Sequence, residues 1–197
     1  MKRVRILFLL FCTTAVCSFA DTTDAVPEVI EHAMWQTGVT TGYDPVYRSL
    51  EYPGGDVDIR TGVCTDVVIR AFRAAGIDLQ VLIHEDMKTH FSEYPKNWGL
   101  KKPDRNIDHR RVPNIATYLK RHDKKLPVTD KGSDYKPGDL VTWKIPGNLD
   151  HIGIVVDVPV KGTDRLMVVH NIGRGARVED ILFEYEITGH YRYFKQP

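Results

Sequence analysis

The spacing of apolar residues changes character near the middle of the chain, and this change constrains the fold more than any other feature. Before residue 123 the apolar side chains recur every three or four residues, which is typical of helices with one buried face. Helices are therefore predicted over 26–37, 64–75, 79–94 and 112–122. Beyond residue 138 the pattern has period two or consists of short β-branched runs, which indicates strands. The predicted strands are 139–145, 152–158, 166–170, 181–187 and 190–194.

Helices first and strands afterwards predict an α+β domain, with N-terminal helices packed on an antiparallel sheet. The segments 40–63 and 94–111 are rich in polar residues, glycine or proline and are predicted to be loops. A chain of this length buries roughly 70% of its unfolded surface, which is enough for a core without disulfide bonds. We therefore expect one folded domain over residues 21–197.

The first twenty residues have the pattern of a secretory signal peptide. Lys2, Arg3 and Arg5 form a basic start, an apolar run covers 6–16, and Ser18-Phe19-Ala20 provides a cleavage site. The apolar run is much shorter than the ~20 residues that span a bilayer, and no later segment approaches that length. We therefore expect no membrane span and a periplasmic or secreted protein from which residues 1–20 are removed.

The charge balance excludes one large class of partner. The chain has 27 Lys and Arg against 26 Asp and Glu, a formal net charge of +1. Proteins that bind nucleic acids usually carry a basic excess that neutralises phosphates. We therefore expect no nucleic-acid partner.

Cysteine usage points to one residue. Of the three cysteines, Cys12 and Cys17 lie in the predicted signal peptide, so Cys64 remains alone in the exported protein. An unpaired thiol outside the cytoplasm is exposed to oxidation, which raises the prospect of a catalytic role; a small buried hydrophobe is the alternative. Cys64 begins a predicted helix, where unpaired backbone N–H groups are expected to lower the pKa of the thiol.

A cysteine nucleophile needs an imidazole as base and a third group that orients it. His151 opens one predicted strand and His170 closes the next, and antiparallel neighbours bring these two ends to the same edge of a sheet. Asn171 is an alternative third residue. Because side chains alternate along a strand, only one of His170 and Asn171 can face the ring of His151.

Short motifs occur in a characteristic order along the chain. They are Gly62-Val63-Cys64-Thr65-Asp66, Pro137-Gly138-Asp139-Leu140-Val141, His151-Ile152-Gly153-Ile154-Val155 and Val169-His170. This set resembles the NlpC/P60 group of papain-like cysteine peptidases, which are bacterial cell-wall hydrolases. The segments 106–114 and 189–192 further resemble a family within that superfamily, the domain of unknown function numbered 1287.

The resemblance implies a papain-like NlpC/P60 fold with Cys64 as nucleophile, His151 as base and His170 as third residue. It also implies an oxyanion role for a tyrosine upstream of the cysteine, for which Tyr52 is the best match. Two departures concern the substrate: the family's usual Asp-Cys-Ser-Gly is Val63-Cys64-Thr65-Asp66 here, and the interval from Cys64 to His151 is longer. The extra helices and loop in that interval are expected to rebuild the substrate groove.

The expected activity is that of an exported cysteine hydrolase that cleaves an amide bond in peptidoglycan peptides, without a cofactor or metal and as a monomer. Candidate substrate-binding residues are Asp66, Asp108, Arg110 and Arg111, because a guanidinium group binds carboxylates in a fixed geometry. Ion pairing among these four residues is the alternative. Three other functions remain open: an acyltransferase or esterase, a wall-binding module without turnover, and a zinc site built from Cys64, His151 and His170.

Overall fold

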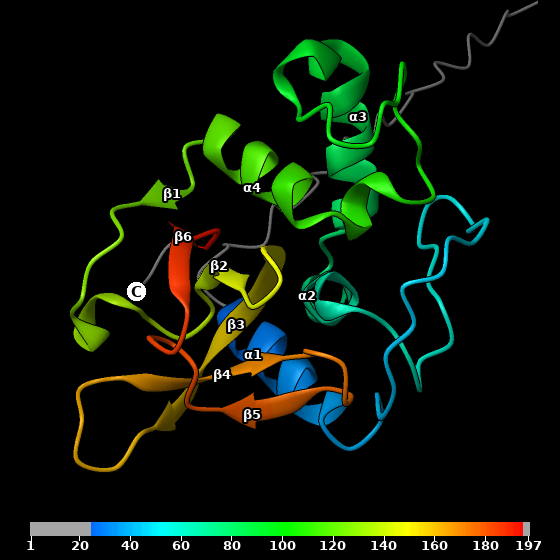
Figure 1. Cartoon of the computed structure of the whole chain (residues 1–197). Helices are drawn as coiled ribbons and strands as arrows, with labels where there is room; N and C mark the ends of the chain where they lie inside the picture. The colour runs from blue at the N-terminus through cyan, green and yellow to red at the C-terminus, as the bar shows by residue number, and fades with distance from the viewer. Residues whose placement is uncertain (1–24, 195–197) are drawn as a thin grey trace, which may run out of the picture.

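The computed structural model describes residues 25–194. The predicted signal peptide therefore lies outside the described residues. Four α-helices come first and are followed by a six-stranded sheet (Figure 1). This arrangement confirms the α+β class.

The helices begin and end close to the predicted boundaries. They are α1 (Ala25–Gln36), α2 (Cys64–Ala74), α3 (Leu79–His90) and α4 (Val112–Arg121). The carboxylate of Asp78 caps α3 by accepting from Gln80 N at 3.0 Å, and Pro113 occupies the first turn of α4, where no backbone N–H is needed. Short 3₁₀ turns cover Phe91–Glu93, Asp108–Arg110 and Gly132–Asp134. The third predicted helix is thus shorter than expected, because its last turn tightens into 3₁₀ geometry.

The strands form one antiparallel sheet in the order β1-β6-β2-β3-β4-β5. They are β1 (Lys125–Leu126), β2 (Leu140–Ile145), β3 (Leu149–Pro159), β4 (Leu166–His170), β5 (Arg177–Glu179) and β6 (Glu186–Tyr191).

The end of the sheet differs from the sequence prediction. The two strands predicted over 181–187 and 190–194 are replaced by the single strand β6, and residues 182–184 form a turn. Ile181 and Leu182 are apolar because they fill the smaller core cluster, and the carbonyl of Leu182 accepts from Trp143 Nε1 at 3.0 Å. Burial in a turn therefore produced a sequence pattern that resembled a strand.

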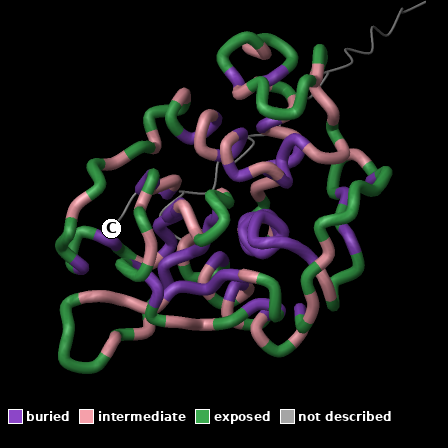
Figure 2. Tube along the Cα trace, in the orientation of Figure 1, coloured by how far each residue is buried: buried purple, intermediate pink, exposed green. Residues whose placement is uncertain are grey.

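Each face of the sheet covers its own apolar core. The larger cluster lies between the sheet and the helices and includes Val67, Phe72, Ile152 and Val169. The smaller cluster lies on the opposite face around Trp143. Helix α2 is buried from Cys64 to Phe72, and Figure 2 shows it enclosed by the rest of the fold. The first residue of α2 is thus placed against the sheet.

The remaining segments surround this centre. Helices α1, α2 and α4 contact the strands, whereas α3 packs against α2, α4 and the 3₁₀ turn at Asp108–Arg110. The segment between α1 and α2 runs along the edge of the molecule beyond α2 in Figure 1. Within residues 25–194, every helix is too short or too polar to cross a membrane.

Candidate active site

Three side chains form a hydrogen-bonded chain across β3, β4 and β5. His151 Nε2 lies 3.0 Å from His170 Nδ1, and His170 Nε2 lies 2.9 Å from Glu179 Oε2. Both rings are almost completely buried, with exposed fractions of 2% and 1%. The carboxylate of Glu179 accepts, so His170 Nε2 carries a proton and, in the neutral ring, Nδ1 accepts. His151 therefore donates from Nε2 and keeps the lone pair of its Nδ1 free.

Strand alternation separates the two candidates for the third residue. His170, the last residue of β4, faces His151, whereas the side chain of Asn171, directly after β4, points the other way. There the amide of Asn171 donates to the carbonyl oxygens of Gly42 and Gly62 at 3.1 and 3.0 Å. Asn171 thus holds the chain just before Cys64, and His170 is the residue that orients His151.

Cys64 is the first residue of α2, and its thiol lies against the strand that carries His151. The backbone N–H of Ile152, the residue directly after His151, points at the sulfur, as do the backbone N–H groups of Cys64 and Thr65. Within residues 25–194 the sulfur makes no side-chain hydrogen bond to His151. The three N–H groups instead form a partly positive surface around the thiol.

The expected low pKa of the Cys64 thiol is not observed. Burial raises the pKa to about 12, and the three backbone N–H groups only partly oppose that rise. The sequence argument considered the helix start alone, but Cys64 as a whole residue is only 5% exposed, so desolvation of the thiolate outweighs the helix dipole. At neutral pH the resting thiol is protonated.

The two histidines are also uncharged at neutral pH. Burial lowers the pKa of His151 to about 3, with a smaller contribution from the neighbouring His170. Burial also lowers the pKa of His170, although Glu179 acts in the opposite direction. His151 is therefore a neutral imidazole with one free lone pair, which is the state required of a general base.

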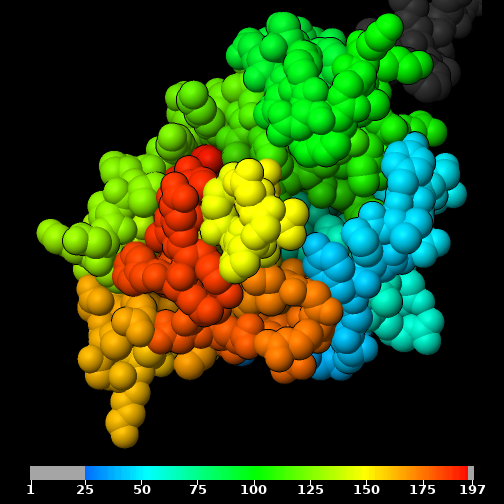
Figure 3. Space-filling model, viewed as in Figure 1, coloured from blue at the N-terminus to red at the C-terminus, as the bar shows by residue number. Residues whose placement is uncertain are grey.

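A cavity of about 220 Å³ opens above Cys64. Tyr43, Trp98, Arg111 and Asp150 are among its lining residues. In Figure 3 the blue segment after α1, the green segment before α4 and the yellow turn between β2 and β3 meet around this hollow. A substrate that enters this cavity therefore passes between these three segments to reach Cys64.

Of the four predicted substrate-binding residues, Asp66 and Arg110 are bound to each other. Arg110 donates to both carboxylate oxygens of Asp66, at 2.8 and 2.9 Å, and the two side chains are 2% and 4% exposed. Asp66 also accepts from Val63 N at 2.6 Å. This pair anchors the start of α2 and leaves little hydrogen-bonding capacity for a ligand.

Arg111 and Asp108 have different surroundings. Asp108 is buried and accepts from Asp104 N and from Arg111 Nη1, the latter at 3.2 Å. The guanidinium of Arg111 lies 4.1 Å from the centre of the Trp98 ring and lines the cavity at Cys64. Arg110 lines the same cavity, but its guanidinium is already engaged by Asp66 and by two backbone carbonyls, so Arg111 is the better placed of the two to bind a ligand.

Tyr52 lies elsewhere. Its hydroxyl donates to Glu85 at 2.9 Å, and its ring packs edge-on against His84. The tyrosine that lines the cavity with Cys64 is Tyr43, and burial together with nearby Cys64 raises the pKa of its phenol to about 12. Both tyrosines precede Cys64 in the same predicted loop, so the sequence contained the candidate but no feature that selected it.

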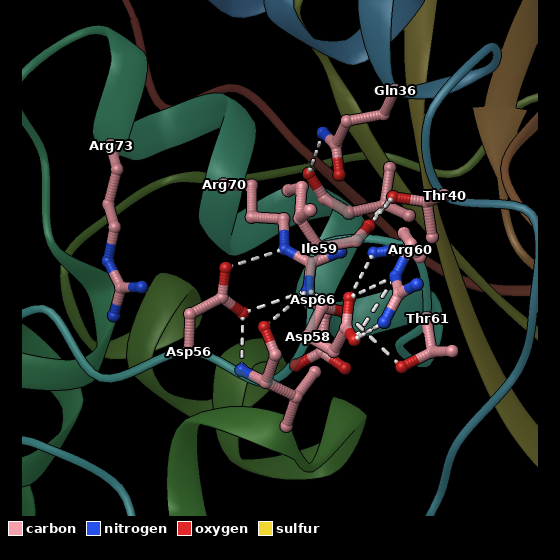
Figure 4. Close-up of polar contacts among 12 residues, drawn as sticks. Gln36, Thr40, Asp56, Asp58, Ile59, Arg60, Thr61, Asp66, Arg70 and Arg73 are labelled. Atoms are coloured by element: carbon pink, nitrogen blue, oxygen red, sulfur yellow. Dashed lines mark hydrogen bonds and ion pairs between the residues drawn. The ribbon is translucent and has the colours of Figure 1, made fainter.

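A buried arginine fixes this loop. Arg70 of α2 donates to both oxygens of Asp56 at 2.8 and 3.0 Å, to Thr40 Oγ1 at 3.2 Å and to the carbonyls of Val57 and Asp58 (Figure 4). The loop that carries Tyr43 is thereby tied to the helix that carries Cys64.

Glu179 was not among the residues selected from the sequence. It lies on a strand of three residues, in a segment whose apolar residues show no clear period.

The zinc alternative required three ligands close together. Among the described residues, no three His, Cys, Asp or Glu side chains are arranged to hold a metal ion.

Comparison with known proteins places the chain in a family. It is 49% identical to "Uncharacterized protein YijF" of Escherichia coli (strain K12) over 201 residues, which cover 95% of this chain and 97% of that protein. A crystal structure of an N-acetylmuramoyl-L-alanine amidase from Bacteroides uniformis aligns with 87% of this chain and 100% of its own, at 16% identity and a TM-score of 0.47. The sequence profile described as "Domain of unknown function (DUF1287)" matches residues 30–193, and the chain belongs to this family.

Proposed function

We propose that the protein is an exported cysteine hydrolase that cleaves an amide bond in peptidoglycan peptides. The observation that carries the proposal is the chain Glu179–His170–His151, which leaves a neutral imidazole with a free Nδ1 on the strand against which the Cys64 thiol packs. The order of motifs from Cys64 to His170, which resembles the NlpC/P60 cysteine peptidases, supports the same reading.

The uncharged resting state favours a mechanism with general-base assistance. His151 Nδ1 takes the thiol proton as the sulfur of Cys64 attacks the carbonyl carbon of the substrate amide. The negative charge that develops on the carbonyl oxygen is stabilised by backbone N–H donors at the start of α2, with the hydroxyl of Tyr43 as a further donor. Tyr43 takes the role that the sequence assigned to Tyr52.

The tetrahedral intermediate then collapses. The C–N bond breaks as His151 returns its proton to the departing amine, which leaves an acyl thioester on Cys64. A water molecule gives a proton to His151 and adds to the thioester carbonyl, and the second collapse releases a carboxylic acid and restores the thiol. His170 and Glu179 hold the ring of His151 in the required tautomer throughout.

The cavity supports an anionic peptide as substrate. Arg111 can bind a carboxylate, and its stacking on Trp98 holds the guanidinium in place. Arg110 also lines the cavity, but both of its bonds to Asp66 would have to break before it could bind a substrate carboxylate in the same way, so we assign it a supporting role.

Mass spectrometry of purified muropeptides, incubated with the wild type or with Cys64→Ala, tests activity and identifies the bond. We expect a product that gains one water molecule with the wild type only. His151→Ala should lower turnover by about a thousandfold, and the double variant should be hardly slower than either single one, because the groups act as a unit. If both single variants keep more than about a tenth of the wild-type rate, the two roles are wrong.

Two functions without hydrolysis of an amide are distinguished by the same experiment. Transfer of the acyl group to an added amine would indicate an acyltransferase, and binding of muropeptides with no product would indicate a wall-binding module. Export is tested separately by N-terminal sequencing of the mature protein, for which the expected first residue is Asp21. A mature protein that retains Met1 would contradict it.

A further inference from the structure

A second cavity, of about 400 Å³, lies beside Glu179 and shares no lining residue with the cavity at Cys64. Its walls come from residues 37–41, which follow α1, and from 174–179, which lead into and form β5. In Figure 3 these segments meet where the blue and orange surfaces touch. Because Glu179 bonds to His170 and also lines this cavity, the cavity adjoins the far end of the hydrogen-bonded histidines.

The walls carry unpaired positive charge. Arg174 and Arg177 are exposed and line the cavity, and within residues 25–194 neither has a hydrogen-bond or ion-pair partner. The single acidic group among the lining residues is Glu179, whose carboxylate already accepts from His170. Two guanidinium groups against one occupied carboxylate leave an excess of positive charge that favours an anion.

The cavity is held by direct contacts between its walls. Ala176 N donates to the carbonyl of Thr40 at 2.7 Å, and Thr40 is itself held by Arg70. Gly175 adopts φ +86°, and a Cβ there would lie 2.5 Å from Thr40 O, so the two segments approach as closely as backbone allows. The hydroxyl of Thr41, which makes no hydrogen bond within the described part of the chain, adds a donor to the two arginines.

We propose that this cavity binds a small organic oxyanion, and that its occupancy is felt by the catalytic histidines through Glu179. A volume of about 400 Å³ exceeds what a bare ion needs and falls within the range of about 300–1,000 Å³ that is common for small-molecule sites. The ligand chemistry is an oxyanion that two guanidinium groups can bind, either a carboxylate or a phosphate. The binding is independent of the proposed hydrolase activity, whereas the effect on catalysis rests on it.

The charge of Glu179 provides an internal check of sign. A bound anion and the carboxylate of Glu179 carry like charges, so removing the charge of Glu179 should tighten binding while removing the arginine charges should weaken it. A general effect of net charge would give the same signs at these residues, but it would also appear when charges elsewhere on the surface are removed, so a control away from the cavity distinguishes the two.

Isothermal titration calorimetry of the full-length mature protein with inorganic phosphate and with glutarate tests the site. We expect saturable one-site binding of at least one probe, weakened about tenfold or more in Arg174→Gln/Arg177→Gln and tightened about threefold or more in Glu179→Gln. The matched control Lys120→Gln/Lys161→Gln removes two positive charges from exposed positions outside the cavity and should change the affinity less than about twofold. The probe that binds more tightly identifies the carboxylate or the phosphate as the ligand group.

Three results would overturn the binding site: no saturable binding of either probe, equal weakening in the lysine control, or weaker binding in Glu179→Gln. The coupling is read by NMR of the imidazole nitrogens of His151 and His170, whose signals should shift on saturation in the wild type but not in the arginine double variant. Unchanged signals at saturation would overturn the coupling and leave the hydrolase proposal to its own test.

Discussion

Glu179 Oε2 lies 2.9 Å from His170 Nε2, although the two residues are on different strands and Glu179 is outside every motif of the sequence. The carboxylate of Glu179 therefore determines which ring nitrogen carries the proton in both His170 and His151. Without an acceptor at His170 Nε2, the proton of that ring can occupy Nδ1 instead, and His151 would then have to accept at Nε2 and protonate Nδ1. In the proposed mechanism, that arrangement removes the lone pair of His151 Nδ1 that receives the thiol proton.

The first prediction concerns this carboxylate. Glu179→Ala should lower kcat by about ten- to a hundredfold, because the orienting acceptor is lost. Glu179→Gln should lose less, since the amide oxygen can still accept from His170 Nε2. Steady-state kinetics on the muropeptide substrate measure the difference, and nitrogen NMR of His151 shows which ring atom is protonated. Wild-type turnover in the alanine variant would contradict the role of Glu179 as a positioning residue.

His170 and Asn171 should give opposite patterns of damage. His170→Ala should lower turnover by about ten- to a thousandfold with little loss of thermal stability, because the ring orients His151. Asn171→Ala should lower the melting temperature, because two carbonyl groups, those of Gly42 and Gly62, lose a buried donor.

The comparison is made with kcat and melting temperature measured on the same preparations. Asn171→Ser, which keeps a shorter polar side chain, serves as the conservative control for stability. If Asn171→Ala abolished turnover without a change in melting temperature, while His170→Ala remained active, the orienting role would pass to Asn171.

Periodicity and motif order were enough to predict the helices, the class of fold and the two histidines that meet. They were not enough for β5 and Glu179, because a three-residue strand has no period to detect and its place is set by pairing with β4. Ile181 and Leu182 misled the strand prediction for a related reason, since a buried turn and a buried strand both need apolar side chains.

The choice between Tyr43 and Tyr52 also depended on long-range contacts. The path of the loop is fixed by contacts of Asp56, which lies within it, with Arg70 of α2, and of Gly42 with Asn171, which is more than a hundred residues further along the chain. The spacing of Tyr43 and Tyr52 from Cys64 in the sequence does not predict which of them these contacts place in the cavity at Cys64. The pKa of Cys64 was misjudged similarly, because helix position is visible in the sequence whereas burial depends on the whole fold.

The third prediction follows from the protonated resting thiol. Iodoacetamide reacts with thiolate, and burial raises the pKa of Cys64 to about 12, so alkylation of the free enzyme at pH 7 should be slower than that of free cysteine. The rate should rise about tenfold per pH unit from pH 7 to pH 9, because the thiolate fraction rises by that factor below the pKa. Mass spectrometry of the labelled protein gives the rate.

The alkylation profile also discriminates between resting states. A thiolate–imidazolium pair would give fast, nearly constant labelling from pH 5 to pH 8. That outcome would contradict the neutral pair. Denatured protein provides the control, since its exposed Cys64 should titrate near the ordinary pKa of a thiol.

The last prediction concerns acid stability and His109, a buried residue outside the catalytic group. His109 is 2% exposed, its Nδ1 has no hydrogen-bond partner, and burial with a smaller effect of Arg73 lowers its pKa to about 3. In the unfolded chain a histidine titrates near the ordinary value of about 6.5. As the pH falls below that value the unfolded state binds a proton that the folded state does not, so folding stability is fully present above about pH 6.5 and is lost towards pH 3.

The expected loss for this one group between pH 7 and pH 5 is about 2 kcal/mol of unfolding free energy. In His109→Gln, which cannot take up a proton, the difference in unfolding free energy between pH 7 and pH 5 should shrink by about that amount, whatever the substitution does to stability at pH 7. Urea denaturation of both proteins at the two pH values measures it. His122→Gln is the comparison at an exposed site, because the side chain of His122 is 44% exposed and lies 3.5 Å from Asp86, so its replacement should not shrink the difference. Equal acid sensitivity of the wild type and His109→Gln would show that the buried ring does not set the acid limit of the fold.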